Sequence, residues 1–297
     1  MISPAAFWHT ERNWSSEAWE QWSFEKLQIP RSQEITILEV PKGCADFEFG
    51  DLEFFWMLGL GTWSFLQLHY SASNSMKSSP QLIAHDLFQS FRMGSRRIEV
   101  LRGISMEIAH NEAVFLSGAS GAGKTTLLYT LAGLERPESG TVEFEGRRLY
   151  NGNSATQARL RNEKMGFVFQ GYFLLPELTA LENVLLPAMI GRRATRSAAE
   201  ESLAAVGLGD RLHHLPAELS GGEQQRVAIA RAVTNNPDII FADEPTGNLD
   251  SKTGDAIIDL LLNLSRERNK TLLVVTHDAR LAARGDRQMH IKDGVLQ

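Results

Sequence analysis

The stretch Gly118-Ala-Ser-Gly-Ala-Gly-Lys-Thr-Thr126 decides the fold expected of this chain. It follows a strand-like apolar run, Ala113–Leu116, and precedes a helix-like run, Leu127–Ala132. A glycine-rich loop in that position curls so that successive backbone N–H groups converge on phosphate oxygens, and the N-terminus of the helix faces the same anion. The spacing G-x-x-x-x-G-K-[ST] adds a lysine for the phosphates and a hydroxyl for Mg²⁺. The stretch therefore predicts an α/β nucleotide-binding domain.

Composition narrows the class of protein without naming an activity. The chain has 297 residues and a net charge of −6, so it lacks the basic footprint of a nucleic-acid-binding protein, and no nucleic-acid partner is expected. Cys44 is its one cysteine, which rules out an intrachain disulfide and a cysteine metal cluster. The first residues do not have the basic and apolar regions of a secretory signal.

Residues 1–75 differ from the rest of the chain. All six tryptophans lie in this segment, and residues 54–68 form an uncharged apolar run that is short of the ~20 residues needed to span a bilayer. The run fits an interfacial membrane anchor, or an element packed on the main domain. We favour a third interpretation, an extension outside the working domain, with Met76 as the natural start of a domain over 76–297. Serines and a proline make the junction loop-like.

A second helix start lies about 100 residues after the phosphate loop, at Leu219-Ser-Gly-Gly-Glu-Gln-Gln225. Ser220 and Glu223 have capping-box spacing, so a helix is expected to begin at Ser220. A helix N-terminus beside two glycines can bind an anion through its free backbone N–H groups. By itself this would be only a good N-cap, and it gains weight from the phosphate loop upstream.

Three further apolar runs each end in polar residues. Ile239–Ala242 leads into Asp243 and Glu244, Thr271–Thr276 leads into His277, and Met165–Phe169 leads into Gln170. Short apolar runs of this kind are typical of a parallel sheet covered on both faces, and ligands bind at the carboxyl ends of such strands. Asp243 there suits Mg²⁺, and Glu244 suits a base that faces a water molecule.

Taken together, these motifs resemble the ATP-binding subunit of an ABC transporter. Gly118–Thr125 looks like the Walker A motif, Ile239–Asp243 like Walker B, and Leu219–Gln225 like the family signature. The motifs follow the family's order from about residue 81 to 297. The resemblance implies a P-loop NTPase fold, with a mixed sheet core and a helical subdomain that carries the signature.

The resemblance also implies a role for each matching residue, with ATP and Mg²⁺ as the bound groups. ATP would contact Phe91, Gly118, Ala119, Ser120, Gly121, Ala122, Gly123, Lys124, Thr125 and Thr126. Mg²⁺ would be held by Thr125, Gln170 and Asp243, and the catalytic residues would be Glu244, His277, Gln170 and Lys124. Asp250 stands at the D-loop position. The signature residues would face the ATP of a second copy in a homodimer, and they are Leu219, Ser220, Gly221, Gly222, Glu223 and Gln224.

A finer resemblance concerns the partners. Glu244–Gly254 is similar to the branch of ABC subunits that serves lipoprotein release, macrolide export and cell division, and Leu174–Val184 looks most like the lipoprotein-releasing member. We therefore expect an ATPase peripheral to the cytoplasmic face of the inner membrane. It would power permease subunits docked near Gln170–Ile190, through exposed apolar residues such as Phe173, Leu174 and Leu175.

Three alternatives remain: an ATPase for macrolide or peptide efflux, a mechanotransmission subunit of cell division, and a soluble ABC ATPase that acts on DNA or ribosomes. The DNA-acting class carries long coiled-coil arms between the phosphate loop and the signature, and the interval from Lys124 to Ser220 is too short for them. Ribosome-acting members usually carry two sets of motifs, and this chain has one.

Overall fold

A computed structural model describes residues 80–192 and 195–297 of the chain. Contacts between Cα atoms divide the chain into Met1–Ser73 and Asn74–Gln297, and the described residues all belong to the second unit. The predictions for the tryptophan-rich segment, for the run at 54–68 and for Met76 as a start lie outside the described residues.

The described part begins with an antiparallel sheet of four strands in the order β2-β1-β4-β5. Its strands are β1 (Pro80–Met93), β2 (Arg96–Ala109), β4 (Ser139–Phe144) and β5 (Arg147–Arg148). β1 and β2 form a long hairpin in which Met93 pairs with Arg96, so the turn lies at Gly94–Ser95.

The six-stranded sheet carries the motifs. Its order is β10-β9-β3-β8-β7-β6, with β3 (Ala113–Ser117), β6 (Met165–Val168), β7 (Ile239–Asp243), β8 (Thr271–Thr276), β9 (Arg287–Lys292) and β10 (Val295–Leu296). All of these strands run parallel except β10, which closes an antiparallel hairpin with β9. The carboxyl ends of four neighbouring strands therefore deliver the phosphate loop, His277, Glu244 and Gln170 to one edge of the sheet.

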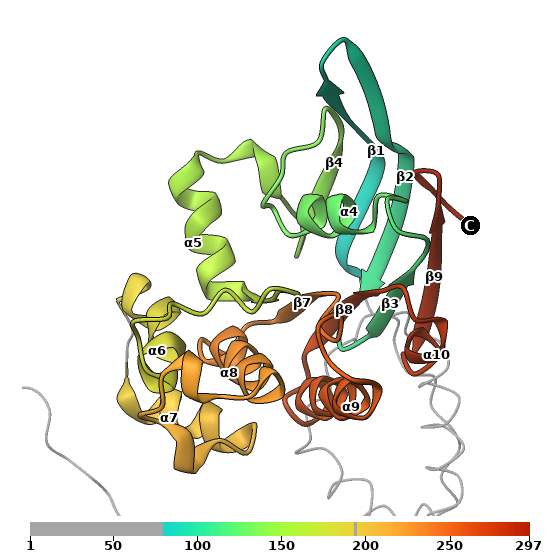
Figure 1. Ribbon diagram of the computed structural model, residues 1–297. Coiled ribbons are helices and arrows are strands. Elements are labelled where there is room, and N and C mark those ends of the chain that lie inside the picture. Colours follow the sequence, from blue (N-terminus) through green and yellow to red (C-terminus); the bar gives the residue numbers. More distant parts are fainter. Residues whose placement is uncertain (1–79, 193–194) are drawn as a thin grey trace, which may run out of the picture. The chain divides into compact units, whose positions relative to one another are not determined.

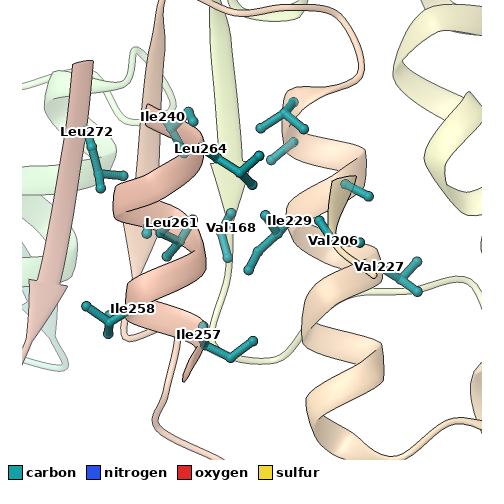
Figure 2. Close-up of a cluster of buried hydrophobic side chains, with 14 of the residues drawn as sticks. Val168, Val206, Val227, Ile229, Ile240, Ile257, Ile258, Leu261, Leu264 and Leu272 are labelled. Carbon is teal, nitrogen blue, oxygen red and sulfur yellow. The ribbon is translucent and has the colours of Figure 1, made fainter. Parts of the chain in front are cut away.

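Apolar side chains cover this sheet on both faces, because successive residues of a strand point to opposite sides. In β8, Leu272 and Val274 belong to one buried cluster, whereas Leu273 and Val275 belong to the other. The first cluster packs against α8 (Gly221–Val233) and α9 (Ser251–Glu267), and Figure 2 shows its side chains reaching between these helices and the strands. The second cluster packs against α4 (Lys124–Leu131), which lies between the two sheets (Figure 1).

The remaining helices form a smaller layer beside α8. α6 (Ala180–Ile190) and α7 (Arg196–Ala205) pack on α8, which carries the signature residues (Figure 1). In the described residues the other helices are α5 (Ser154–Lys164), α10 (Ala279–Ala282) and three short 3₁₀ turns, η2 (Leu149–Asn151), η3 (Gly209–Arg211) and η4 (Pro216–Glu218). α5 buries none of its residues, so it lacks the apolar stripe by which a helix is found in a sequence.

The capping box predicted at Ser220 and Glu223 is present, and α6 begins with a second one. Thr179 caps α6 with Glu182, and Ser220 caps α8 with Glu223, each through reciprocal hydrogen bonds. Within the ranges that the structure describes, no helix combines the length and apolarity that crossing a membrane requires.

Candidate nucleotide site

The loop between β3 and α4 needs glycine at two positions for reasons of space. Gly118 and Gly123 have φ angles of 155° and 103°, in a region that residues with a Cβ rarely adopt. A Cβ on Gly118 would collide with the carbonyl oxygen of Ile291 in β9, and one on Gly123 would lie 2.8 Å from the carbonyl oxygen of Val100 in β2. The loop is thus pressed against both sheets, and its curl is fixed by the fold.

Lys124 is buried at the start of α4, and its ammonium group contacts the loop itself. Nζ donates to the carbonyl oxygens of Gly118 and Ala119, at 3.0 Å each, and lies 3.7 Å from Oε1 of Glu244. The lysine therefore joins the phosphate loop to the end of β7, across the intervening strand β8.

The next residue makes a second link to β7. The Thr125 hydroxyl donates to Oδ1 of Asp243 at 3.0 Å. Asp243 is 7% exposed, and burial raises the pKa of its carboxyl above the ordinary value, although hydrogen bonds from Thr125 and Tyr129 oppose that shift. Burial therefore affects the pKa of Asp243 more than its hydrogen bonds do. A further positive charge beside this carboxylate would stabilise its ionised form.

The donor set fits Mg²⁺. A threonine hydroxyl, an aspartate carboxylate and a glutamine amide are hard oxygen ligands, which Mg²⁺ prefers, and it usually takes one or two protein groups together with substrate phosphates and water. Within the described ranges, no group of three or more His, Cys, Asp or Glu side chains could hold a metal ion. A Mg²⁺ ion here would therefore share its coordination with phosphate oxygens.

Glu244 follows β7 in an unusual backbone conformation. Its φ is 43°, a left-handed value that is uncommon for a residue with a side chain, and its N–H donates to the carbonyl oxygen of Val275 at 3.0 Å. Oε2 lies 3.0 Å from Nδ1 of His277, the residue after β8. The strained backbone aims the carboxylate at the space between His277 and Lys124, and such strain is concentrated at functional sites.

Gln170 lies past the end of β6 on an exposed turn. Asn248 donates to its carbonyl oxygen at 2.9 Å, and a Cβ on Gly247 would lie 2.6 Å from Nε2 of Gln170. The glutamine side chain therefore borders the loop that connects Glu244 to Asp250. Asp250 itself is the N-cap of α9 and accepts from the backbone N–H of Thr253.

The signature residues meet other partners. Glu223 and Ser220 bond to each other, Gln224 donates to the carbonyl oxygens of Pro216 and Leu219, and a Cβ on Gly222 would lie 2.8 Å from Thr253. Within the part of the chain that the structure describes, they form no hydrogen bond or ion pair with the phosphate loop. Phe91 likewise stands apart, 41% exposed on β1 opposite Ile98.

Two residues near the site were not predicted from the sequence. Tyr129 lies one turn after Thr125 on α4, and burial together with the charge of Asp243 raises the pKa of its hydroxyl. Arg231 of α8 donates to the carbonyl oxygens of Tyr172 and Phe173, at 2.6 Å each. The spacing of four residues from Thr125 could have indicated Tyr129, whereas nothing in the local sequence indicates the contacts of Arg231.

An apolar groove lies beside this segment. It has a volume of about 400 Å³, and Phe173, Ile190 and Arg231 are among the residues that line it. Phe173 is 65% and Leu175 is 47% exposed, as predicted for docking residues. Leu174 differs from the prediction, because it is partly buried against the core cluster of α8 and α9.

Comparison with known proteins assigns the family. The sequence pattern of the ABC transporter family matches residues 101–247. The lipoprotein-releasing system ATP-binding protein LolD of Syntrophotalea carbinolica is 54% identical over 212 residues, which cover 70% of this chain and 93% of that protein. The chain belongs to the ABC transporter family of ATP-binding proteins. As a member of this family it is an ATPase, and its fold is that of an ABC cassette.

Other relatives agree with this assignment. The uncharacterized ABC transporter ATP-binding protein YbbA of Escherichia coli K12 is 50% identical over 216 residues, covering 72% of this chain and 95% of that protein. Among solved structures, the dimeric post-hydrolysis state of the ATP-binding cassette MJ0796, bound to ADP and Pi, has a TM-score of 0.68 and 40% identity. That similarity covers 73% of this chain and 96% of the cassette. The resemblance inferred from the motifs is thereby confirmed.

Proposed function

We propose that the chain hydrolyses Mg²⁺-bound ATP at the carboxyl edge of the six-stranded sheet. The loop N–H groups and Lys124 would hold the phosphates, and Phe91 would stack on adenine. Thr125, Asp243 and Gln170 would hold Mg²⁺, which neutralises charge that develops on the transferred phosphoryl group. Positioning and charge neutralisation of this kind suit the loose transition state of phosphoryl transfer. The contact between Thr125 and Asp243 is the observation that best supports this arrangement.

Glu244 is the proposed residue for the attacking water. Its carboxylate lies between Lys124 and His277, at 3.7 Å and 3.0 Å, so it has a fixed orientation at the edge where the phosphates would lie. Glu244 would orient or deprotonate the water, and His277 would stabilise the γ-phosphate. A carboxylate held by two partners loses little orientational freedom when the substrate arrives, which is the advantage of a pre-organised site.

The signature helix is proposed to complete the site of a second copy. The N-terminus of α8 presents Gly221 and Gly222, and Ser220 and Glu223 are bonded to each other rather than to the phosphate loop of their own chain. A helix N-terminus favours an anion, so the γ-phosphate of a partner-bound ATP is a suitable ligand. The two dimeric structures of MJ0796, at 40% and 41% identity, support an ATP-closed homodimer.

We further propose that the ATPase powers a permease that releases lipoproteins from the inner membrane, with the chain peripheral to the cytoplasmic face. The identity of 54% to the LolD protein of Syntrophotalea carbinolica supports this substrate. The groove beside Phe173 and Ile190 is the proposed docking surface for the membrane subunits. Two of its residues are large, apolar and more than half exposed, at 65% and 76%.

Co-purification from membranes tests the proposal. The full chain, tagged at its C-terminus and carrying Glu244→Gln to slow turnover, should retain membrane-spanning permease subunits in detergent, and the Phe173→Ser variant should retain fewer. Identification of those subunits by mass spectrometry separates the candidates, because a lipoprotein-releasing, a macrolide-exporting and a cell-division complex contain different membrane proteins. Absence of any membrane subunit would contradict a role in transport.

A further inference from the structure

The side chain of His277 has few contacts of its own. It is 62% exposed, and within the described residues its one side-chain hydrogen bond joins Nδ1 to Oε2 of Glu244 at 3.0 Å. His277 lies between the end of β8 and Asp278, the N-cap residue of α10. The place of its imidazole therefore depends on how firmly the start of α10 is held.

Arg280 joins the start of α10 to α9. Its Nη1 donates to both carboxylate oxygens of Asp255 in α9, at 2.9 Å each, and its Nη2 donates to Oδ2 of Asp278 at 3.4 Å. The backbone N–H of Arg280 donates to Oδ1 of Asp278 at 2.8 Å. One guanidinium thus bridges a carboxylate of α9 and the carboxylate next to His277, and Figure 1 shows α10 beside α9.

Two arginines of the α10 segment face two acidic residues of α9. Asp255 and Asp259 are four residues apart, so they share a face of the helix, and their like charges repel each other. Arg280 pairs with Asp255, and Arg284 contacts both carboxylates. The α10 segment is therefore attached to α9 through charge pairs, in addition to the burial of Leu281 in the core.

We propose that Arg280 is a positioning residue for His277, which it keeps beside Glu244 by fastening the start of α10 to α9. This inference rests on the proposed function, in which His277 stabilises the γ-phosphate. Arg280 touches none of the reacting atoms. It acts through Asp278 and the backbone that joins Asp278 to His277.

The chemistry of arginine suits such a bridge. Its guanidinium is planar and carries donors on separate nitrogens, so it can serve two carboxylates at once, which the single ammonium group of lysine does less well. Misplacement of a catalytic group by about 1 Å can slow a reaction on the order of 10²-fold. The effect of Arg280 should be smaller, because the exposed fractions of its side chain and of Asp255 are 59% and 36%. We expect about fivefold, which corresponds to ~1 kcal/mol, the upper end for exposed ion pairs.

The rival explanation is that the buried Leu281 alone seats α10, and that the exposed arginine adds nothing, as is common for surface ion pairs. Arg280→Gln removes the bridge, and Asp255→Asn removes the charge of its partner on α9. Arg266→Gln is the matched control, because Arg266 also forms an exposed ion pair from α9, at 3.7 Å, but with Asp286, which precedes β9.

The measurement is ATP hydrolysis by the full chain, with radiolabelled ATP so that slow variants can be compared. In Arg280→Gln and Asp255→Asn, kcat should fall about fivefold while KM for ATP stays within about twofold, since the phosphate loop is untouched. In a His277→Ala background, Arg280→Gln should cause no further fall, because a residue that acts only through His277 then has nothing to position.

Hydrogen exchange of the nucleotide-free chain gives a second readout, independent of activity. The amides of His277 and Asp278 should exchange faster in Arg280→Gln than in the parent chain, because the start of α10 is no longer fastened to α9. Arg266→Gln should leave both this exchange and kcat at the parent values.

The outcomes that overturn the inference differ from those that overturn the proposed function. A kcat in Arg280→Gln within about twofold of the parent, unchanged exchange at His277, or an undiminished fall in the His277→Ala background would show that Arg280 does not position His277. A His277→Ala variant that hydrolyses ATP at the parent rate would instead remove the proposed role of His277, and the role of Arg280 with it.

Discussion

Oε1 of Glu244 lies 3.7 Å from Nζ of Lys124, so the proposed base and the phosphate-loop lysine form an ion pair across the sheet edge. Glu244→Gln keeps the shape of the side chain and removes its charge and basicity. We expect ATP hydrolysis to fall by ~10²–10⁴-fold, the range that general bases contribute, with ATP affinity retained. The ATP-bound dimer should also become stable enough to isolate by size-exclusion chromatography.

The control for this variant is Glu267→Gln, at the exposed end of α9, which should hydrolyse ATP at the parent rate. A Glu244→Gln enzyme with parent turnover would remove the assignment of Glu244 as the base. A variant that neither hydrolyses nor binds ATP would instead indicate that the ion pair with Lys124 supports the loop itself.

The phosphate loop offers a graded test of steric constraint. Gly121 has a φ of 78°, and a Cβ added to it would meet nothing within 4 Å, whereas Gly123 combines a φ of 103° with the Val100 carbonyl at 2.8 Å. Alanine at either position should lose roughly 1–3 kcal/mol of stability through backbone strain. Gly123→Ala should lose more than Gly121→Ala, because its Cβ would also collide with the Val100 carbonyl, and it should bind ATP poorly. Gly209→Ala, with an ordinary φ and free space, should unfold at the parent denaturant concentration.

Much of the fold could be predicted because the relevant signals are local. The apolar run Ile239–Ala242 is long enough for a strand, and the capping box of Ser220 and Glu223 fixes where α8 begins. The fixed spacing of glycine, lysine and threonine in Gly118–Thr125 is compatible with few loop conformations. For these elements the sequence contains the whole physical cause, and the expected strands and helix starts are confirmed.

What could not be predicted depends on the order of strands and on contacts distant in sequence. β8 lies between β3 and β7, and this order places His277 beside Glu244. The order depends on the packing of the complete sheet. The Arg231 contacts join residues 58 and 59 positions apart, and α5 has no buried face to mark it. Leu174 was predicted to be exposed because a local apolar run does not reveal which member turns toward the core.

In the absence of ligands, we expect the buried, ionised carboxylate of Asp243 to lower the stability of the folded protein. Burial raises the pKa of its carboxyl above the ordinary 3.8. Below 3.8 the group is protonated in both the folded and unfolded states and the cost is absent. The cost grows as the pH rises from 3.8 to the raised pKa, and it is complete above that pKa and at neutral pH. Asp243→Asn cannot ionise and still offers an acceptor to Thr125, so it should melt at a higher temperature at pH 7 in EDTA.

The same experiment at lower pH checks the cause. The gain in melting temperature should shrink as the pH falls through the raised pKa, because the parent carboxyl then becomes neutral as well. Asp210→Asn, on an exposed 3₁₀ turn, should show no comparable gain. A lower melting temperature for Asp243→Asn at pH 7 would mean that the contacts of the charged form outweigh its burial.

Arg231 fastens the segment after Gln170 to the signature helix. Its guanidinium donates to the carbonyl oxygens of Tyr172 and Phe173, whose φ angles of 59° and 48° are both left-handed, and burial lowers its pKa. Hydrogen bonds from a charged group contribute about 1.5–3 kcal/mol each, enough to hold two such residues in place. Arg231→Lys keeps the positive charge but loses the planar guanidinium that can donate to two carbonyl oxygens at once. Lysine is therefore not expected to replace arginine in holding this segment.

We expect both Arg231→Ala and Arg231→Lys to speed hydrogen exchange at the amides of Tyr172 and Phe173, which now donate to the carbonyl oxygens of Phe169 and Gly171. Arg226 lies on the same helix as Arg231 but donates to the carbonyl oxygen of Val206, so Arg226→Ala should leave that exchange unchanged. Because Phe173 lines the proposed docking groove, the Arg231 variants should also show less stimulation of hydrolysis when permease subunits are added. Unchanged exchange in Arg231→Ala would show that the segment keeps its conformation without the arginine.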